Sequence, residues 1–320
     1  MVPTLSSAPR IVAIVGPTAS GKTVLAMDAA RKFSGEIVSC DSVQVYRGLD
    51  IGSGKASLAD RTEIRHHLVD IFGFEEEMNA GVFVARSARA IEDILGRGRL
   101  PIVTGGTGLY LTALLKGLFD QGGTNLTLRA RLEELALRHG SARLHRFLAT
   151  KDPDYAARTQ PEDRVRIVRA LEVCLSMGRP FSQVQRERQP AFRGETLMIG
   201  LEVDRAELRD RITQRVKGML AEGLINETCT ALSGVKRDAP TPRALGSIGY
   251  REVAERLAQG PLPTGGDEEL LRAIVVSSMQ YAKRQMTYFR NQFAIEWFGT
   301  HDAALRRIEQ WAGDKNNRGV

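Results

Sequence analysis

Residues 11–23 read Ile-Val-Ala-Ile-Val-Gly-Pro-Thr-Ala-Ser-Gly-Lys-Thr, an apolar run followed by a glycine-rich segment. The apolar run, residues 11–15, stops at Gly16 and Pro17, which is typical of a buried strand in a parallel sheet. The glycine-rich segment, residues 16–23, matches the pattern G-x-x-x-x-G-K-[ST] in full. A helical stretch follows it. The order of strand, loop and helix predicts a P-loop core, an α/β fold in which helices flank a parallel sheet.

Each residue type in this segment has a physical use in binding phosphate. The glycines let successive backbone N–H groups curve around a phosphate, which the N-terminus of the following helix also attracts. Lys22 supplies a mobile positive charge, and the Thr23 hydroxyl can reach a Mg²⁺ ion bound to the phosphates. The alternative, a chance glycine-rich turn, does not account for the strand and helix on either side. We expect Mg²⁺ as cofactor with Thr23 as its ligand, and a di- or triphosphate bound by Gly16, Pro17, Thr18, Ala19, Ser20, Gly21, Lys22 and Thr23.

Outward from this loop, short β-branched runs alternate with helical stretches. The alternation indicates βαβ units and a parallel sheet. The further strands are predicted at residues 36–40, 100–104 and 196–203, and the helices of this part at residues 24–33, 82–95, 206–221 and, as the last one, 268–291.

Between residues 124 and 190 the pattern is helical, with predicted helices at residues 126–139 and 161–177 and no strand. This stretch contains thirteen lysines and arginines and eight acidic residues, so it carries a net charge of +5. We therefore predict a discontinuous P-loop core, residues 10–123 and 196–313, interrupted by a basic, all-helical insertion domain, residues 124–195. Residues 1–9 and 314–320 are predicted to be flexible termini.

The composition narrows the class of protein. The 320 residues include 45 Lys and Arg against 38 Asp and Glu, a formal net charge of +7, which suggests an anionic partner without naming it. Cys40, Cys174 and Cys229 are odd in number and widely spaced, which argues against a disulfide framework or a zinc finger and favours a cytoplasmic location. No apolar run near the start approaches the about 20 residues that span a bilayer, and residues 1–10 lack a signal-peptide core, so we expect no membrane partner.

Two acidic residues and a histidine pair are candidates for metal or catalytic roles. Asp204 follows the strand at residues 196–203 and could hold a metal in nucleotide hydrolysis or kinase chemistry, but it also precedes a helix that it could cap. Asp41 follows the strand at residues 36–40, at the edge of a parallel sheet where ligands bind, and its alternative role is to form a turn. His66 and His67 lack a further ligand at zinc spacing, which favours packing or capping over metal binding.

Longer motifs follow one another along the chain. They are DSVQVYRGLDIGSGK (residues 41–55), HHLVD (66–70), GGTGLYL (105–111), DPDYAARTQPEDRVRIVRALEV (152–173), SIGYRE (247–252) and YAKRQMTYFR (281–290). Together with GPTASGKT, this ordered set resembles the tRNA dimethylallyltransferases, also called isopentenyl-tRNA transferases, over about residues 11–290. The resemblance implies that the phosphate loop holds the pyrophosphate of dimethylallyl diphosphate with Mg²⁺. It also implies a monomer that transfers the dimethylallyl group to N6 of the adenosine 3′ to the anticodon (tRNA position 37) and releases diphosphate.

The resemblance also implies roles for residues at matching positions. Asp41 would be the general base that takes the proton of the adenine amine as the C–N bond develops, and Thr107 would form a hydrogen bond near that amine. Lys22, the loop amides and the metal on Thr23 would stabilise the departing pyrophosphate. The residues implied to bind tRNA, whose stacked target base must be extracted, are Asp41, Ser42, Val43, Gln44, Thr107, Arg129, Val165, Arg166, Ile167, Val168, Arg169, Lys283, Arg284 and Arg290.

The sequence departs from the family pattern at several positions. Gln160 and Val165 stand in a segment where members often have His and Gln, and Tyr288 stands where Trp is common. Gly246 stands where many members have an Arg associated with the pyrophosphate. On the diphosphate side, Arg243 or Arg251 is the candidate to replace it.

Other readings stay open at this point. A small-molecule P-loop kinase, or a transferase acting on free adenine nucleotides, would have little use for a basic insertion, and a non-catalytic RNA-binding module would leave the phosphate loop idle. In the last predicted helix, Lys283, Arg284 and Arg290 have no acidic neighbour. They form either a solvated basic face or a set of salt-sensitive phosphate contacts.

Overall fold

The protein is described by a computed structural model that covers residues 8–118, 125–235, 242–260 and 267–313. Of the predicted flexible termini, residues 1–7 and 314–320 lie outside the described residues. The chain forms two compact units, Met1–Leu114 together with Phe192–Val320 as unit 1, and Leu115–Ala191 as unit 2. The insertion domain predicted at residues 124–195 covers much of unit 2, and its boundaries stay a prediction.

The sheet of unit 1 has six parallel strands in the order β3-β2-β4-β1-β5-β6. The strands predicted from the sequence are confirmed: the strand at residues 100–104 has the predicted ends, and the ends of the others differ by at most two residues. Strands β3 and β6 were not predicted. Their bounds are β1 (Arg10–Val15), β2 (Gly35–Ser39), β3 (His66–His67), β4 (Leu100–Thr104), β5 (Glu195–Leu201) and β6 (Glu296–Phe298).

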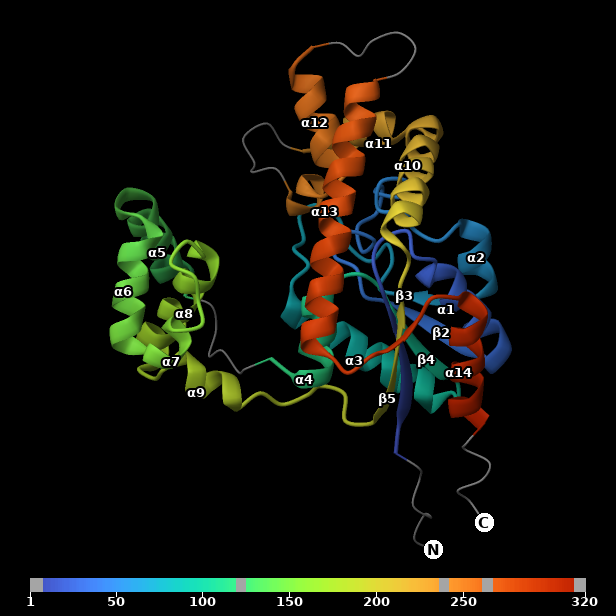
Figure 1. The fold of residues 1–320 in the computed structure, drawn as a ribbon, viewed down its shortest axis with the longest axis horizontal. Helices are drawn as coiled ribbons and strands as arrows, with labels where there is room; N and C mark the ends of the chain where they lie inside the picture. The colour runs from blue at the N-terminus through green and yellow to red at the C-terminus, as the bar shows by residue number, and fades with distance from the viewer. Residues whose placement is uncertain (1–7, 119–124, 236–241, 261–266, 314–320) are drawn as a thin grey trace, which may run out of the picture. The chain divides into compact units, whose positions relative to one another are not determined.

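Helices cover both faces of this sheet (Figure 1). Val12 and Ile14 of β1 share a hydrophobic cluster with Leu25 of α1 and Ile308 of α14. Side chains alternate along a strand, so Ile11, which is also fully buried, belongs to the opposite face. Helix α3 packs against β2 and β4, and Figure 1 shows it across the sheet from α1 and α14. The helices of the two faces are α1 (Lys22–Phe33), α2 (Leu58–Glu63), α3 (Ala80–Gly96), α4 (Gly108–Lys116) and α14 (His301–Gly313).

A group of helices extends beyond the end of the sheet at which its parallel strands finish (Figure 1). Helix α13 packs against α10 and α12, and α11 packs against α12. Because this is the end at which the parallel strands finish, the group stands next to the loops that follow β1, β2 and β4. Its members are α10 (Arg205–Glu222), α11 (Leu224–Ser233), the 3₁₀ helix η1 (Arg243–Gly246), α12 (Tyr250–Ala258) and α13 (Glu268–Gln292).

Two of the helix predictions were wrong in part. Helix α13 is not the last helix, because β6 and α14 follow it, and α14 buries Ala304, Ile308 and Trp311 at helical spacing. The helix predicted from residue 161 begins at Arg164, because the side chain of Asp163 accepts a hydrogen bond from the N–H of Arg166 and caps the helix there.

Unit 2 contains five helices among its described residues and an apolar core of its own. Ile167 and Leu171 of α8 are fully buried there with Leu148 of α6. Within residues 125–191 the described chain forms no strand, and Gln189 makes a single antiparallel bridge with Leu118. The helices are α5 (Leu126–His139), α6 (Ser141–Lys151), α7 (Pro153–Ala156), α8 (Arg164–Met177) and α9 (Phe181–Arg186).

Two general properties complete the fold. All three cysteines are free; Cys40 and Cys174 are buried and Cys229 is exposed. Across the described parts of the chain, the helices are all too short or too polar to cross a membrane.

Candidate active site

The phosphate loop connects the end of β1 to the start of α1. Gly16, Ala19 and Gly21 have φ values of 151°, 62° and 93°. A Cβ at Gly16 would lie 2.6 Å from the carbonyl oxygen of Leu201 on β5, so the close approach of loop and strand requires glycine. Helix α1 begins without a side-chain cap or an acidic residue in its first turn. Its first N–H groups and its positive dipole end are thereby left for an anion.

Lys22 lies at the start of α1 and its ammonium group donates a 2.6 Å hydrogen bond to the carbonyl oxygen of Pro17. The pKa of Lys22 is lowered to about 7, first by burial and then by the charge of Arg215, against the opposing effect of the Asp41 carboxylate. These three charged groups therefore interact at one place. A phosphate bound in the loop would stabilise the charged form of Lys22 and raise its pKa.

Arg215 also belongs to this place, although the sequence motifs did not single it out. Arg215 is exposed overall, but burial of its guanidinium lowers the pKa of that group, and the charge of Asp41 opposes the shift. A Cβ at Gly54 would lie 2.0 Å from Nη2 of Arg215, so the guanidinium packs on the loop at residues 50–55. A signal was available, because Arg215 follows the buried Ile212 by three residues and interrupts the apolar stripe of α10.

Asp41 directly follows β2 and combines the two roles that the sequence left open. Its Oδ1 accepts hydrogen bonds from the N–H groups of Val43, at 2.8 Å, and Gln44, at 3.2 Å, and so forms a turn. The described residues provide no hydrogen bond to Oδ2. One carboxylate oxygen thus shapes the turn, and the other is available to a ligand.

Asp41 and Thr107 meet because β2 and β4 are neighbours and both end here. The N–H of Cys40 donates to the carbonyl oxygen of Thr104 at 2.8 Å, and the N–H of Thr107 donates to the carbonyl oxygen of Cys40 at 3.2 Å. A Cβ at Gly105 would lie 2.1 Å from that Cys40 oxygen, which explains the glycine. The hydroxyl oxygen of Thr107 is buried and has no hydrogen-bond partner among the described residues. We call residues 40–41 and 104–107 the base corner.

A carboxylate on α11 holds the loop that follows the turn. Glu227 accepts hydrogen bonds from the N–H groups of Asp50, Ile51 and Gly52 at 2.8, 2.9 and 3.0 Å. The hydroxyl of Tyr250, whose side chain is fully buried, donates to Glu227 at 2.6 Å. Glu227 therefore anchors the loop at residues 50–55.

That anchored loop in turn holds Gln44, which was predicted to line the reacting base. The amide nitrogen of Gln44 donates to the carbonyl oxygens of Ser53 and Gly54, at 3.4 and 3.3 Å, and its amide oxygen accepts from the hydroxyl of Ser39 at 2.8 Å. Gln44 is thus fixed from both the strand and the loop, and its tRNA contact stays a prediction.

Replacing Glu227 by glutamine is expected to lower the free energy of unfolding by about 2 kcal/mol, because a charged acceptor of three N–H groups becomes a neutral amide. Urea unfolding followed by circular dichroism measures the change. Glu222→Gln, at the exposed end of α10, is the control and should shift stability by less than about 0.5 kcal/mol. Equal stability of the two variants would contradict the anchoring role of Glu227.

The predicted tRNA-binding residues of unit 2 fall into two groups. Arg129 and Arg169 both pair with the buried carboxylate of Glu172, at 2.9 and 2.7 Å, whereas Arg166 is largely exposed and lies 3.4 Å from Asp163. Val165 is exposed. By contrast, the side chains of Ile167 and Val168 lie in the core of unit 2, because the helical period of α8 turns them inward, so the structure gives these two a packing role.

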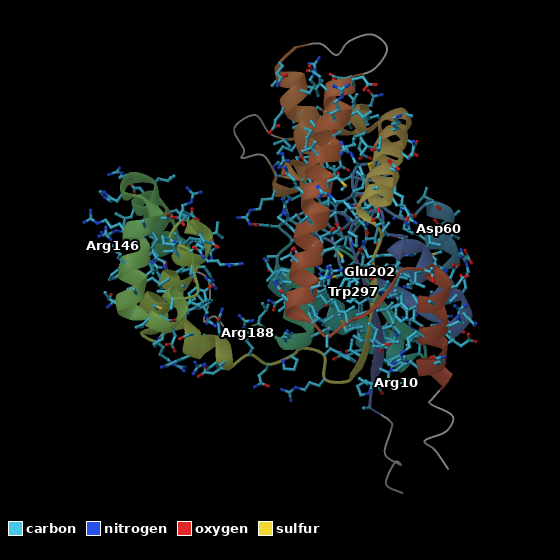
Figure 2. The ribbon with its side chains drawn as sticks, viewed as in Figure 1. Arg10, Asp60, Arg146, Arg188, Glu202 and Trp297 are labelled. Atoms are coloured by element: carbon cyan, nitrogen blue, oxygen red, sulfur yellow. The ribbon has the colours of Figure 1, made fainter. Side chains whose placement is uncertain are left out.

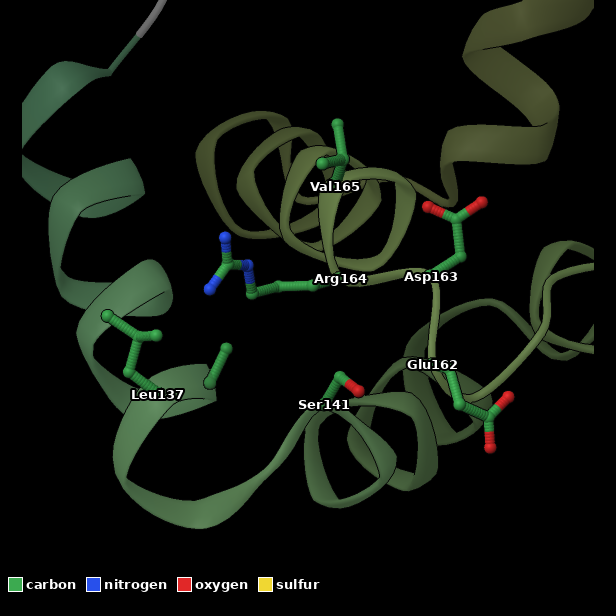
Figure 3. Close-up of a pocket in the computed structure, with 7 residues that line it drawn as sticks. Leu137, Ser141, Glu162, Asp163, Arg164 and Val165 are labelled. Atoms are coloured by element: carbon green, nitrogen blue, oxygen red, sulfur yellow. The ribbon is translucent and has the colours of Figure 1, made fainter. Parts of the chain in front are cut away.

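An open pocket of about 520 Å³ lies beside Val165 in unit 2 (Figure 3). Figure 3 shows Arg164 extending from the start of α8 toward α5, while Glu162 points away from it. The pocket combines a cation with the exposed apolar side chains of Leu137 and Val165. Its lining residues are Ala136, Leu137, Ser141, Glu162, Asp163, Arg164 and Val165.

Of the predicted tRNA-binding residues on α13, Lys283 and Arg284 are exposed. The sequence suggested that Arg290 lacks an acidic neighbour, and this was wrong. Its guanidinium lies 3.0 Å from the carboxylate of Glu202 and over the ring of Trp297. Figure 2 labels Glu202 and Trp297 beside α13. The acidic partner was missed because it comes from the end of β5, far away in the sequence.

The remaining candidates have structural partners. Arg243 pairs with Glu77 at 2.7 Å, and Arg251 pairs with Glu252, so both candidates for the diphosphate side contact carboxylates. The Asp204 carboxylate accepts the N–H of Ala206 at 2.8 Å, and the bonds of this helix cap lower the pKa of Asp204. The capping alternative for Asp204 is therefore confirmed.

The histidine pair also has structural partners. His67 lies 2.7 Å from the buried carboxylate of Glu36, and His66 lies 2.7 Å from the carbonyl oxygen of Ile64. Among the described residues, no three His, Cys, Asp or Glu side chains are grouped so that they could hold a metal together.

Comparison with known proteins tests the family resemblance directly. Residues 44–292 match the family described as IPP transferase. The tRNA dimethylallyltransferase of Anaeromyxobacter sp. (strain Fw109-5) is 45% identical over 304 residues, which cover 94% of this chain and 99% of that relative. The tRNA dimethylallyltransferase of Geobacter metallireducens is 45% identical over 303 residues, covering 93% and 96% of the two chains.

Solved structures agree with these relatives. The full-length tRNA isopentenylpyrophosphate transferase from Bacillus halodurans is 34% identical, with a TM-score of 0.68 and 97% of each chain covered. A eukaryotic dimethylallyltransferase acting on tRNA is 26% identical, with a TM-score of 0.77 over 98% of this chain and 78% of that one. These relatives are tRNA dimethylallyltransferases, which are prenyltransferases. The chain belongs to the same family, the IPP transferases.

Proposed function

We propose that this protein transfers the dimethylallyl group of dimethylallyl diphosphate to N6 of the adenosine 3′ to the anticodon of tRNA, position 37, and releases diphosphate. The observation that carries the proposal is that the phosphate loop and the backbone beside Asp41 are joined through Gln285, which contacts both Thr18 and Gly106. The charge of Asp41 also raises the pKa of Lys22 in that loop.

The leaving group is held by the loop. As the bond between the allylic carbon and the diphosphate oxygen breaks, the electron pair stays with the diphosphate. Lys22, Arg215 and the first N–H groups of α1 face the charge that builds up there. Preorganised groups of this kind contribute about 3 kcal/mol each to stabilising a transition state.

The acceptor needs a base because the lone pair of an adenine amine is delocalised into the ring. As the C–N bond forms, the proton of N6 moves to the free Oδ2 of Asp41. The unpartnered hydroxyl of Thr107, on the neighbouring strand end, orients the base by a hydrogen bond.

Mg²⁺ is part of the proposal, and Thr23 is the residue that would hold it. A Mg²⁺ ion usually keeps several waters and takes one or two protein ligands together with substrate phosphates, so one hydroxyl next to a phosphate loop fits it. The exposed side chain of Thr23 follows Lys22 at the start of α1. When bound, the ion would neutralise charge on the diphosphate.

The partner and the setting follow from the same proposal. Each unit, considered by itself, offers exposed cations that suit tRNA phosphates: Arg166 in unit 2, and Lys283 and Arg284 of α13 in unit 1. We also propose that the protein acts as a monomer in the cytoplasm.

Incubation of the purified protein with dimethylallyl diphosphate, Mg²⁺ and unmodified tRNA tests the function. Mass spectrometry of the digested nucleosides should show a dimethylallyl adduct on the adenosine after the anticodon. A tRNA with guanosine at that position is the matched control. Transfer to AMP or ATP with the same efficiency would overturn the assignment of tRNA as the acceptor and favour a small-molecule transferase.

The pKa of Lys22 predicts how diphosphate binding depends on pH. Lys22 is mostly charged below its pKa of about 7 and mostly neutral above it. Bound diphosphate favours the charged form, so binding should take up about one proton at pH 8 and nearly none at pH 6, and affinity should fall as the pH rises. Calorimetry with inorganic pyrophosphate in buffers of different ionisation enthalpy counts the protons.

Lys22→Arg is the control for this titration, because a guanidinium stays charged over the whole range. Subtracting its proton uptake from that of the wild type removes the contribution of pyrophosphate itself. The same uptake in both proteins at pH 8 would contradict a neutral Lys22 in the free protein.

A further inference from the structure

Gln285 of α13 is a buried polar residue that connects two loops of the candidate active site. Its side chain is 5% exposed. The amide oxygen accepts the N–H of Thr18 in the phosphate loop at 2.9 Å, and the amide nitrogen donates to the carbonyl oxygen of Gly106 at 3.0 Å. Both ends of one buried side chain thus serve loops that are distant from it in the sequence.

The fit on the Gly106 side is tight. A Cβ at Gly106 would lie 2.0 Å from the amide nitrogen of Gln285, so this position has no room for another residue while Gln285 is in place. The hydroxyl of Tyr281, one turn earlier on α13, also donates to the Gly106 carbonyl oxygen, at 3.4 Å. Helix α13 therefore fixes the direction of the Gly106 carbonyl.

The N–H end of the same peptide group is bonded to the backbone next to the general base, Asp41. The peptide that joins Gly106 to Thr107 has its carbonyl held by Gln285 and its N–H held by the carbonyl oxygen of Cys40. Asp41 is the next residue after Cys40. A shift of Gly106 would therefore displace both Thr107 and the backbone that carries Asp41.

We propose that Gln285 is a positioning residue for the transfer, which holds the phosphate loop and the base corner at a fixed separation. The proposal rests on the proposed function, in which the loop carries the donor and the corner activates the acceptor. Two separately bound substrates react only when their atoms are aligned, and a misplacement of about 1 Å can lower the rate about 10²-fold. Gln285 contacts both the phosphate loop and the base corner. Losing these contacts should therefore lower the rate of the bound complex more than the affinity for the diphosphate or for tRNA.

Three variants test the role. Gln285→Leu removes both hydrogen bonds, and Gln285→Glu keeps an acceptor for Thr18 but places a carboxylate against the Gly106 carbonyl. Gln280→Leu, at an exposed glutamine of the same helix, is the control. Each variant is measured for kcat in tRNA modification, for dissociation constants of pyrophosphate and of tRNA, and for thermal stability, after the wild type has been shown to modify tRNA.

The expected result for Gln285→Leu is a kcat about 100-fold below wild type, with both dissociation constants within about threefold and Gln280→Leu unchanged. The pH dependence of kcat in Gln285→Glu separates a positioning role from a packing role, because a packing role would not change this pH dependence. A protonated carboxyl donates to Gly106 while its other oxygen accepts from Thr18, so the ratio of its kcat to that of the wild type should rise at least tenfold from pH 8 to pH 6. Burial raises the pKa of a carboxyl, which brings this titration into the measured range.

Either of two results would overturn the positioning role. One is a kcat of Gln285→Leu within threefold of wild type. The other is a loss of kcat matched by equal losses of pyrophosphate and tRNA affinity, with a Gln285→Glu ratio that is independent of pH. Failure of the wild type to modify tRNA would instead reject the proposed function, which keeps the two failures distinct.

Discussion

Replacing Asp41 by asparagine is expected to lower kcat for tRNA modification by about 10³-fold, because the variant cannot accept the proton of the adenine amine. Asparagine keeps an oxygen acceptor for the N–H groups of Val43 and Gln44, so the turn after β2 should persist. The substitution therefore separates the chemical role of Asp41 from its turn-forming role. Single-turnover rates with saturating donor measure the loss directly.

Asp41→Ala provides the comparison. It should lower turnover to a similar extent. Because it also removes the acceptor of the turn, it should lower the free energy of unfolding by about 1 kcal/mol. Affinity for tRNA, measured by filter binding, should stay within about threefold for both variants. Near-normal turnover in Asp41→Asn would remove Asp41 from the role of general base, and a large loss only in Asp41→Ala would assign it to the turn.

The parts of the fold that the sequence predicts are those specified by local patterns. β1, β2, β4 and β5 are apolar runs of five to seven residues, and the phosphate loop is a continuous motif. β3 and β6 have two and three residues, too few for alternation to show, and they exist because β2 and β5 offer free edges. Helix α14 is a different case, because its stripe of Ala304, Ile308 and Trp311 was present in the sequence and was not recognised.

The parts of the site that the sequence could not predict depend on packing between distant segments. Asp41 and Thr107 were implied by motifs, but their proximity requires that β2 and β4 be neighbours in the sheet. Arg215, Glu227 and Gln285 come from three helices that follow the last long strand, and their side chains reach loops more than 150 residues earlier. Only the packing of α10, α11 and α13 on those loops shows what these residues do.

The net charge of a segment also does not show which of its cations are free to bind a partner. The five surplus charges of residues 124–190 are a property of composition, but Arg129 and Arg169 use theirs to neutralise the buried Glu172. Removing such a carboxylate from water is unfavourable unless it is paired, so part of the basic character serves the core of unit 2. Arg166, which is mostly exposed, is the better candidate for a phosphate contact.

Replacing Arg215 by glutamine is expected to raise the dissociation constant of pyrophosphate about 50-fold, because one charge-assisted contact to a diphosphate contributes about 2 to 3 kcal/mol. The KM for dimethylallyl diphosphate should rise with it, while tRNA affinity should stay within about twofold. A second effect follows from the charge itself. The positive charge of Arg215 lowers the pKa of Lys22, so its removal should raise that pKa and reduce the proton uptake on pyrophosphate binding at pH 8.

The two readouts make the experiment on Arg215 decisive. Arg211→Gln, one turn earlier on α10 at a half-exposed arginine paired with Glu207, is the control and should change neither quantity. A structural role for Arg215 would lower thermal stability and leave the proton count of Lys22 as it is. An unchanged pyrophosphate affinity in Arg215→Gln would exclude Arg215 from the diphosphate site. A raised Kd together with a reduced proton uptake requires Arg215 and Lys22 to share one anion, which is the geometry that the transfer needs to stabilise its leaving group.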